Sequence, residues 1–255
     1  MSCGLIITPV INKKCENFKN MDVNEYIKRL ETEFKKRAND KIAAGQKAYM
    51  KNNFEFYGLK TPVRHEIQKP FLVKEHLPPK SEMEKIVKIL WEKPEREYQY
   101  FAQEMAFKYA KRFNENDINL FEFMIVNKSW WDTVDFIAPK LIGKYFKVFS
   151  EQRDKRVKKW ISSGNIWLQR SSLLFQLNYK EELDTELLEY IINSLVGSEE
   201  FFVNKAIGWI LRQYSKINPE WVIEFTKRTK LDKLSYKEAL RLINGDKIFR
   251  EGSPS

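Results

Sequence analysis

Apolar side chains recur every three or four positions along much of the chain. One such series runs from Val23 to Phe34, and similar series cover residues 83–91 and 187–195. This spacing places the apolar side chains on one face of a helix, so each series predicts an amphipathic helix. Long runs of alternating β-branched residues are missing, and glycine is sparse, with nine in 255 residues. The pattern therefore predicts an all-α fold without a sheet.

Local signals for helix starts accompany these series. Residues 81–84 and 235–238 have the Ser-x-x-Glu spacing of a capping box, which predicts Ser81 and Ser235 as N-caps. Thr61 followed by Pro62 predicts an N-cap with proline in the first helical turn. Breaks between the series fall at Pro78–Pro79, Pro94, Asn114–Asn116, Ser162–Gly164, Gly197–Ser198 and Asn218–Pro219. The chain is therefore predicted to alternate between helix, short turn and helix.

A fixed period becomes visible when these pieces are superimposed. Two sets of three residues are spaced 35 positions apart: Trp131, Ile166 and Phe201, and Asp135, Arg170 and Lys205. Phe101 continues the register backwards, 34 positions before Asp135. A repeat of this length corresponds to one helix pair, and stacked pairs share a core. We expect a HEAT-like solenoid, with equivalent positions of successive repeats lining its concave face.

The repeats define the expected domain organisation. Residues 21–244 are predicted to form one HEAT-like repeat domain, flanked by a peripheral N-terminal extension of residues 1–20 and a tail of residues 245–255. Tetratricopeptide repeats have a similar length, but their tryptophan, Leu-Gly and alanine pattern is missing here.

Charge and composition point to a class of partner. Lys and Arg number 45 against 35 Asp and Glu, which gives a net charge of +10 and favours nucleic acid as the partner. No run of eighteen apolar residues is present, so no membrane span is expected. The N-terminal stretch lacks a basic region and a small-residue cleavage site, so no signal peptide is predicted. Cys3 and Cys15 exclude a disulfide framework, and together these features predict a cytoplasmic protein.

The segment KSWWDTVD (128–135) carries the first candidate chemistry. Ser129 is predicted to cap a helix, and Asp132 completes an acidic variant of the capping box. Asp135 lies one turn after Trp131 on the same side of that helix and lacks such a local explanation. A favourable carboxylate near a helix N-terminus is the alternative interpretation of Asp135.

The other members of the register extend this segment into a candidate site. Arg170 and Lys205 occupy the positions equivalent to Asp135, and Trp209 lies one turn after Lys205. An arginine can bind a phosphate with both arms of its guanidinium, and aromatic faces can meet a cation or a sugar. Each tryptophan taken alone is more typical of a buried core. Taken together, these residues indicate a groove that holds nucleic acid.

Other kinds of site find no support. His65 and His76 lack metal-ligand spacing, two cysteines are too few for the usual iron–sulfur cluster, and no glycine-rich phosphate loop is present. Neither a metal nor a cofactor is therefore expected. Lys205 could form a Schiff base, but a lysine in a DNA-facing groove more often contacts phosphate.

Five stretches of the sequence resemble the DNA alkylation repair enzyme family of bacterial HEAT-like glycosylases: KSWWDTVD (128–135), NIWLQR (165–170), KAIGWILRQY (205–214), KAYMKN (47–52) and PEREYQYFA (94–102). The resemblance runs from about Val23 to about Asn244 and leaves the N-terminal extension uncovered. It implies catalytic roles for Asp135, Trp131 and Trp209.

The resemblance also implies the residues that contact DNA. Arg170 would bind the DNA backbone, and Tyr49 matches a tyrosine that lies near DNA in the first helix pair. Lys205 and Arg212 are expected to be further DNA contacts.

These observations predict a monofunctional DNA glycosylase that removes cationic alkylated purines, N3-methyladenine and N7-methylguanine, from double-stranded DNA. Such a base leaves as a neutral molecule, so the lack of an obvious general acid is no obstacle. An anionic Asp135 would stabilise the oxocarbenium-like sugar and orient water. The resemblance implies that the lesion can be processed without flipping. No obligate protein partner is expected.

Two alternatives stay open at this point. A catalytically silent HEAT-like module could bind nucleic acid or a protein helix, although a mere scaffold has no need for an acid one turn from a groove tryptophan. A tetratricopeptide-like peptide binder is disfavoured by the basic charge.

Overall fold

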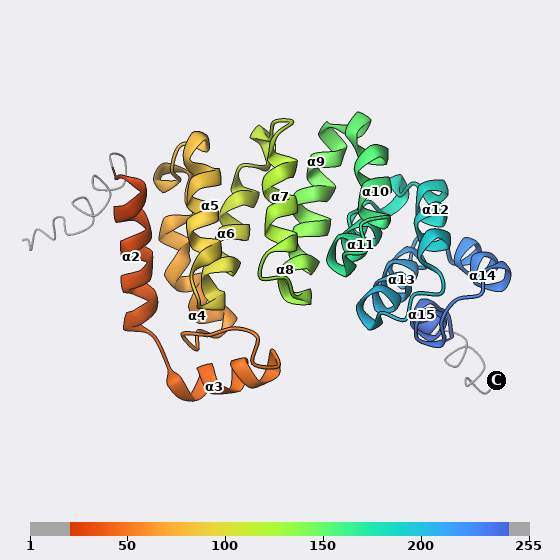
Figure 1. Cartoon of the computed structure of the whole chain (residues 1–255), viewed down its shortest axis with the longest axis horizontal. Helices are drawn as coiled ribbons and strands as arrows, with labels where there is room; N and C mark the ends of the chain where they lie inside the picture. Colours follow the sequence, from red (N-terminus) through yellow and green to blue (C-terminus); the bar gives the residue numbers. More distant parts are fainter. Residues whose placement is uncertain (1–20, 245–255) are drawn as a thin grey trace, which may run out of the picture. The chain divides into compact units, whose positions relative to one another are not determined.

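The computed structural model describes residues 21–244, and the regular structure in that range is helical (Figure 1). A single isolated β-bridge joins Glu55 to Glu95, and residues 21–244 contain no strand. The prediction of an all-α, helical-repeat fold is confirmed. The predicted peripheral extension with its two cysteines and the predicted tail lie outside the described residues. No helix within 21–244 is both long enough and apolar enough to cross a membrane.

The chain divides into two compact units, Met1–Arg112 and Phe113–Ser255. Each unit is a set of packed helices, and each is described by itself. The first unit contains α2 (Val23–Lys36), α3 (Asp40–Tyr49), α4 (Thr61–Gln68), α5 (Met83–Glu92) and α6 (Arg96–Lys108), with the 3₁₀ turns η1 (Lys69–Phe71), η2 (Lys74–His76), η3 (Lys80–Glu82) and η4 (Ala110–Arg112).

A buried carboxylate fixes the loop that follows α3 in the first unit. Glu97 of α6 accepts hydrogen bonds from the backbone N–H groups of Tyr57, Gly58 and Leu59, each at 3.1 Å. Burial raises the pKa of Glu97, whereas these backbone hydrogen bonds lower it. Gly58 has a φ of +81°, and a Cβ there would lie 2.1 Å from the carbonyl oxygen of Asn39. Glycine is therefore required at this turn.

The second unit contains the helices that carry the repeat register. They are α7 (Asp117–Val126), α8 (Trp131–Phe136), the π-helical segment η5 (Ile137–Ile142), α9 (Gly143–Val148), η6 (Ser150–Gln152), α10 (Arg153–Ile161), α11 (Ile166–Leu174), η7 (Lys180–Glu182), α12 (Thr185–Leu195), α13 (Phe201–Tyr214), α14 (Pro219–Arg228) and α15 (Lys233–Ala239).

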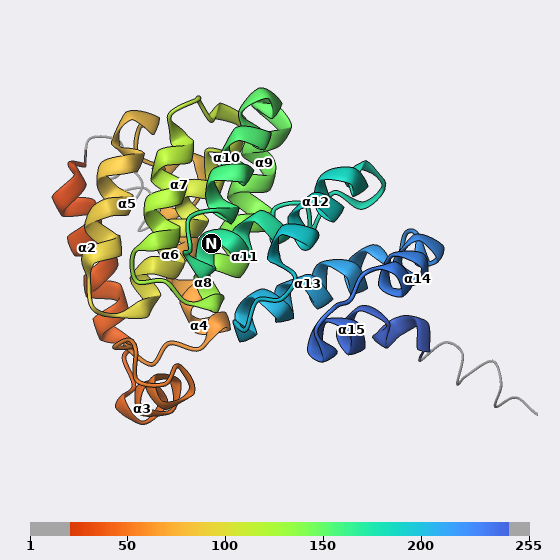
Figure 2. The same cartoon turned by 45° about the vertical axis from the view of Figure 1, so that its right-hand side comes forward.

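The 35-residue register coincides with the starts of three helices in this unit. Trp131, Ile166 and Phe201 are the first residues of α8, α11 and α13. α11 packs against both α8 and α13, and α13 packs along α15 (Figure 2). Since equivalent helices are neighbours, residues at equivalent positions on them can meet across the interfaces.

Proline interrupts the helical geometry just after the candidate acid. α8, η5 and α9 follow one another directly from Trp131 to Val148, with Pro139 inside the π-helical segment. Proline has no N–H to donate and its ring crowds the preceding turn, so an ordinary α-helical hydrogen-bond pattern is not available there. Widening to a π turn is one way that helices accommodate such a position. Asp135 therefore lies on the last regular turn before the bulge.

The predicted hydroxyl caps are wrong. α4 begins at Thr61 itself, after an N-cap at Lys60, and α5 has Glu82 rather than Ser81 at its N-cap. Ser129 instead donates to the carbonyl oxygen of Ile125. The helices of residues 21–244 that have a side-chain cap use Asp or Asn in this role: Asp22, Asn39, Asn165, Asp184, Asn218 and Asp232.

The physical reason is that a hydroxyl can also donate a hydrogen bond. Ser235 lies inside α15 and donates to the carbonyl oxygen of Asn204 at 2.8 Å, so it holds α15 against α13 instead of capping a helix. Asp232 is the N-cap of α15 in its place, and its carboxylate accepts from the backbone N–H of Leu234.

Candidate active site

Asp135 and Arg170 form a two-pronged ion pair between α8 and α11. Nε of Arg170 donates to Oδ1 of Asp135 at 2.8 Å, and Nη2 donates to Oδ2 at 2.9 Å. The side chain of Arg170 is 4% exposed and that of Asp135 is 20% exposed. This is the strongest common geometry for an arginine–carboxylate pair. The carboxylate is thus held in one orientation while part of it stays open to solvent.

The remaining arm of Arg170 is also engaged. Nη1 donates to the backbone carbonyl of Phe202 at 2.6 Å, and the guanidinium lies 5.9 Å from the ring centre of Trp209. The guanidinium fork that was expected to grip a phosphate is directed at Asp135 in this structure. Its role in binding DNA stays a prediction, while its contacts here are those of a group that positions Asp135.

The electrostatics of Asp135 reflect two opposing influences. Burial raises the pKa of its carboxyl, whereas the hydrogen bonds and the charge of Arg170 lower it, and repulsion from Asp132 raises it further. The balance is a pKa above the ordinary value. A carboxylate in this setting is costly to ionise, and the arginine is the group that supports the ionised form.

The two predicted tryptophans lie on α8, which carries Asp135, and on α13, which packs against the helix of Arg170. Trp131 begins α8, one turn before Asp135, and is half-buried. Trp209 is half-buried on α13 beneath Arg170. The structure therefore brings Asp135, Arg170 and Trp209 together, and Trp131 is positioned by its spacing on the same helix as Asp135.

An aromatic cluster next to the pair was missed from the sequence. Trp130, the N-cap residue of α8, packs on Trp167 at 5.7 Å and on Phe202 at 5.4 Å between ring centres, and these two partners lie 4.9 Å apart. Phe202 also supplies the carbonyl that receives Arg170. The cluster thus fixes the backbone that orients the guanidinium. The signal in the sequence is Trp130 of KSWWDTVD, which directly precedes the predicted site residue Trp131.

Lys205 and Arg212 both contact Glu238, which is predicted from the sequence as the end of a capping box. Nζ of Lys205 lies 2.7 Å from Oε2 of Glu238, and the guanidinium of Arg212 contacts the other oxygen. Arg241 lies 3.7 Å from the same carboxylate. Glu238 is 8% exposed at its side chain. We call Lys205, Arg212, Glu238 and Arg241 the Glu238 cluster.

Positive charge exceeds negative charge in this cluster. Burial lowers the pKa of Lys205, and repulsion from Arg212, Arg241 and Arg170 lowers it further. The pKa of Arg212 is lowered by burial and then by Arg241. Three cations share one carboxylate, so the local potential favours an additional anion.

Close packing of two helices creates the cluster. A Cβ on Gly208 of α13 would lie 2.6 Å from Cβ of Glu238 and 3.0 Å from the carbonyl oxygen of Ser235. Only a glycine lets α15 approach α13 this closely, and the approach brings Glu238 beside Lys205.

Tyr49 belongs to the first unit and is described apart from these residues. It ends α3, and the residue is 69% exposed. Both histidines also lie in that unit: His65 is 3.4 Å from Glu104, and His76 contacts the carbonyl oxygen of Pro70 at 2.7 Å. Within residues 21–244, no three His, Cys, Asp or Glu side chains are grouped so that they could hold a metal ion.

Comparisons with known proteins address the identity of the chain. No curated protein matches it. A solved structure described as "Predicted DNA alkylation repair enzyme from Enterococcus faecalis" matches with 35% sequence identity and a TM-score of 0.75, covering 80% of this chain and 95% of that one. The profile of the family described as DNA alkylation repair enzyme matches residues 30–243. The chain belongs to the DNA alkylation repair enzyme family.

Proposed function

We propose that the protein is a DNA glycosylase that releases cationic alkylated purines, such as N3-methyladenine and N7-methylguanine, from duplex DNA. The observation that carries this proposal is the largely buried Asp135 carboxylate, which Arg170 holds with two hydrogen bonds beside Trp209. A helical scaffold that only binds DNA gains nothing from an acid on its DNA-facing side, since a carboxylate repels phosphate.

The chemistry follows from the charge of the substrate. A purine alkylated at N3 or N7 is cationic, so the base departs as a neutral molecule when its glycosidic bond breaks. Positive charge then develops on the sugar, as in glycoside hydrolysis generally. An anion beside that sugar stabilises the transition state more than the ground state, which is the requirement for catalysis. Asp135 is proposed to be this anion, and it can also orient the attacking water.

Arg170 is proposed to position Asp135 and keep it ionised. A carboxylate has about four lone-pair directions, and Arg170 occupies two of them. The open part of the carboxylate can face the sugar and a water molecule. Since burial alone would favour the neutral acid, the guanidinium supports the charged form that the reaction needs.

The tryptophans and the Glu238 cluster are proposed to supply binding. The faces of Trp131 and Trp209 can each attract a cationic base or sugar by about 1 kcal/mol. Lys205, Arg212 and Arg241 together outnumber the one acid that they share. Their excess charge can hold the DNA backbone on α13 and α15.

The direct test is incubation with a duplex that contains a single N7-methylguanine, followed by measurement of the released base. We expect free N7-methylguanine and an abasic strand. A protein that binds the duplex but releases no base would support the catalytically silent scaffold instead.

A second substrate sharpens the assignment. Hypoxanthine or ethenoadenine in the same sequence is neutral and needs protonation to leave, whereas Asp135 is proposed to act as an anion and not as an acid. We expect release of these bases to be slower than release of N7-methylguanine by about 100-fold or more, because general acid catalysis contributes about that much. Comparable rates on both substrates would contradict a mechanism that relies on the charge of the lesion.

A further inference from the structure

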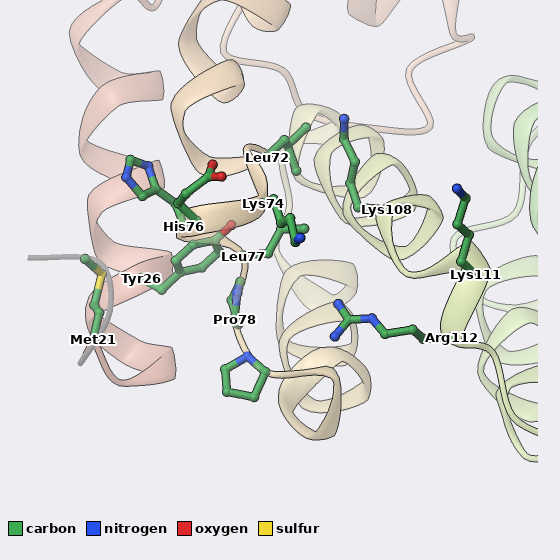
Figure 3. Close-up of a pocket in the computed structure, with 12 residues that line it drawn as sticks. Met21, Tyr26, Leu72, Lys74, His76, Leu77, Pro78, Lys108, Lys111 and Arg112 are labelled. Carbon is green, nitrogen blue, oxygen red and sulfur yellow. The ribbon is translucent and has the colours of Figure 1, made fainter. Parts of the chain in front are cut away.

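The first unit contains a cavity that plays no part in the proposed reaction. It has a volume of about 800 Å³, and its lining residues lie between Met21 and Arg112 (Figure 3). Tyr26 of α2 and Pro78 lie on one side, and Lys108, Lys111 and Arg112, from the end of α6 and from η4, come from the other. Cavities of about 300–1,000 Å³ are the usual size for small-molecule sites.

The floor of the cavity is apolar. Tyr26 is 2% exposed and its hydroxyl donates to the carbonyl oxygen of Phe71 at 2.9 Å, so it closes the bottom of the cavity without offering it a polar group. Leu72, Leu77 and Pro78 complete this side. Such a surface favours the flat face of a ring over an ion.

The rim of the cavity is cationic. Lys74, Lys108, Lys111 and Arg112 line it and are exposed. Within residues 21–244 none of these four side chains has an ion pair, and Arg112 lies over the ring of Tyr109 at 5.0 Å. Among the lining residues that the structure describes, Glu75 is the one acid. The described part of the rim therefore carries four cations against one acid, an excess of positive charge.

A neighbouring cavity of the same unit shows that this excess is local. A cavity of about 480 Å³ between α2 and α4 is lined by cations too, namely Arg29, Lys36 and Arg37. There, each cation has an acid partner: Arg29 with Glu25 at 2.7 Å, Lys36 with Glu33 at 2.6 Å and Arg37 with Glu66 at 3.4 Å. The net charge of the chain alone therefore does not explain the unpaired rim of the larger cavity.

We propose that the larger cavity binds a nucleoside monophosphate. Its phosphate would lie between the side chains of Lys108, Lys111 and Arg112. Its base would lie against the apolar floor, on the partly exposed side chains of Leu77 and Pro78. Inorganic phosphate leaves the floor unused, and an uncharged nucleoside leaves the cations unused. Both parts of the ligand are needed for full affinity. Intact duplex DNA is disfavoured because a cavity of this size encloses a small molecule and not a double helix.

Calorimetric titration of the full chain with deoxyadenosine monophosphate, deoxyadenosine and inorganic phosphate tests this proposal. We expect the monophosphate to bind at least tenfold more tightly than either of the other two compounds. Equal affinity for the monophosphate and inorganic phosphate would overturn the proposed role of the floor, and no binding of the monophosphate would overturn the proposal entirely.

Charge-matched double variants separate the cavity from the general charge of the protein. Lys108→Gln with Arg112→Gln should weaken monophosphate binding at least tenfold. Lys36→Gln with Arg37→Gln removes the same charge from the other cavity and should change the affinity less than twofold. If the first double variant is less stable to heat than the wild type, Lys74→Gln with Lys111→Gln replaces it as the cavity variant. Equal losses in the cavity and control variants would overturn the proposal.

Duplex binding identifies the competing occupant. The first cavity pair and the control pair should bind an undamaged duplex with equal affinity. A larger loss for the cavity pair would identify the rim as a DNA contact and overturn assignment to a small ligand. These measurements do not depend on base release, so they stand or fall separately from the proposed glycosylase activity.

Discussion

Asp135 and Glu238 are two largely buried carboxylates of the second unit, and both meet arginine, but the balance of charge around them differs. Asp135 faces a single guanidinium through two short hydrogen bonds, and a fifth of its side chain is exposed. Glu238 is more deeply buried and shared by Lys205, Arg212 and Arg241. In the first arrangement an arginine orients a carboxylate, whereas in the second a carboxylate holds three cations close together.

The same unit therefore holds two different arrangements of charge, a balanced ion pair at Asp135 and an excess of cations around Glu238. The charges of Asp135 and Arg170 balance, and their two hydrogen bonds fix the orientation of the carboxylate. A fixed carboxylate suits the proposed action on a reacting sugar. A cluster with excess cations attracts an anion from solution, which suits a backbone contact. Substituting each carboxylate should therefore change a different step of the proposed reaction.

The largest effect is expected from Asp135→Asn. The amide keeps the shape of the side chain but removes the charge that stabilises the transition state, so base release at saturating enzyme should fall about 100-fold or more. Affinity for the damaged duplex should change less than threefold in a binding titration. Asp132→Asn, three positions earlier on the same helix, is the matched control and should keep most of the activity. If Asp135→Asn weakened only binding, the distinction between the two carboxylates would fail.

Arg170→Ala should have the next largest effect, and it should appear in stability as well as in rate. Removing one partner of a buried ion pair leaves the other uncompensated and costs about 3 kcal/mol or more of the free energy of unfolding. Base release should fall because Asp135 loses both its orientation and its support for ionisation. Chemical denaturation and single-turnover kinetics measure the two effects. Arg228→Ala, at an exposed pair with Glu189, should change the free energy of unfolding far less, because solvent screens an exposed pair. Equal losses at both arginines would contradict the positioning role.

A smaller effect is expected in the pH dependence of base release, and its direction follows from the raised pKa of Asp135. Because burial raises the pKa of Asp135, protonation should remove activity at a pH above the ordinary range of an aspartate as the pH falls. The raised pKa also means that the folded protein binds this proton more tightly than the unfolded chain does. The contribution of Asp135 to stability is therefore greatest at low pH and is lost as the pH rises through its folded-state pKa. Arg170→Lys should move the acid limb of the rate profile to higher pH. An unchanged acid limb would show that another group controls it.

The smallest effect is expected from Glu238→Gln. The change frees one net positive charge in the Glu238 cluster, so the slope of the logarithm of affinity against the logarithm of salt concentration should steepen by about one. Base release at saturating enzyme should stay within about threefold of the wild type. Glu189→Gln alters an acid that pairs with Arg228 elsewhere in the unit and is the control. A slope that does not change would exclude the cluster from DNA binding.

The register of the repeats was predictable because it depends only on spacing along the chain. One helix pair with its turns occupies a fixed number of residues, so Trp131, Ile166 and Phe201 could be aligned from the sequence alone, and they do begin α8, α11 and α13. The same alignment placed Asp135 and Arg170 side by side. Their two hydrogen bonds could not be predicted, because periodicity fixes where a Cα lies and leaves the side-chain rotamer open.

The Glu238 cluster escaped prediction for a different reason. Glu238 had a local explanation as the last residue of a capping box with Ser235. Its real partners, Lys205 and Arg212, are distant in sequence and meet it only because Gly208 lets two helices touch. The hydroxyl caps failed similarly, since a serine that can accept from an N–H can equally donate to a carbonyl on another helix.

A side-by-side comparison of Asp135→Asn and Glu238→Gln on one N7-methylguanine duplex tests the central claim most directly. Single-turnover release is measured with enzyme in excess over the dissociation constant of each variant, so that binding no longer limits the rate. We predict that Asp135→Asn loses about 100-fold or more of the rate, while Glu238→Gln stays within about threefold of the wild type and differs from it in salt dependence. Release by Asp135→Asn at the wild-type rate, or an equal loss in both variants, would contradict the separate roles of the two carboxylates.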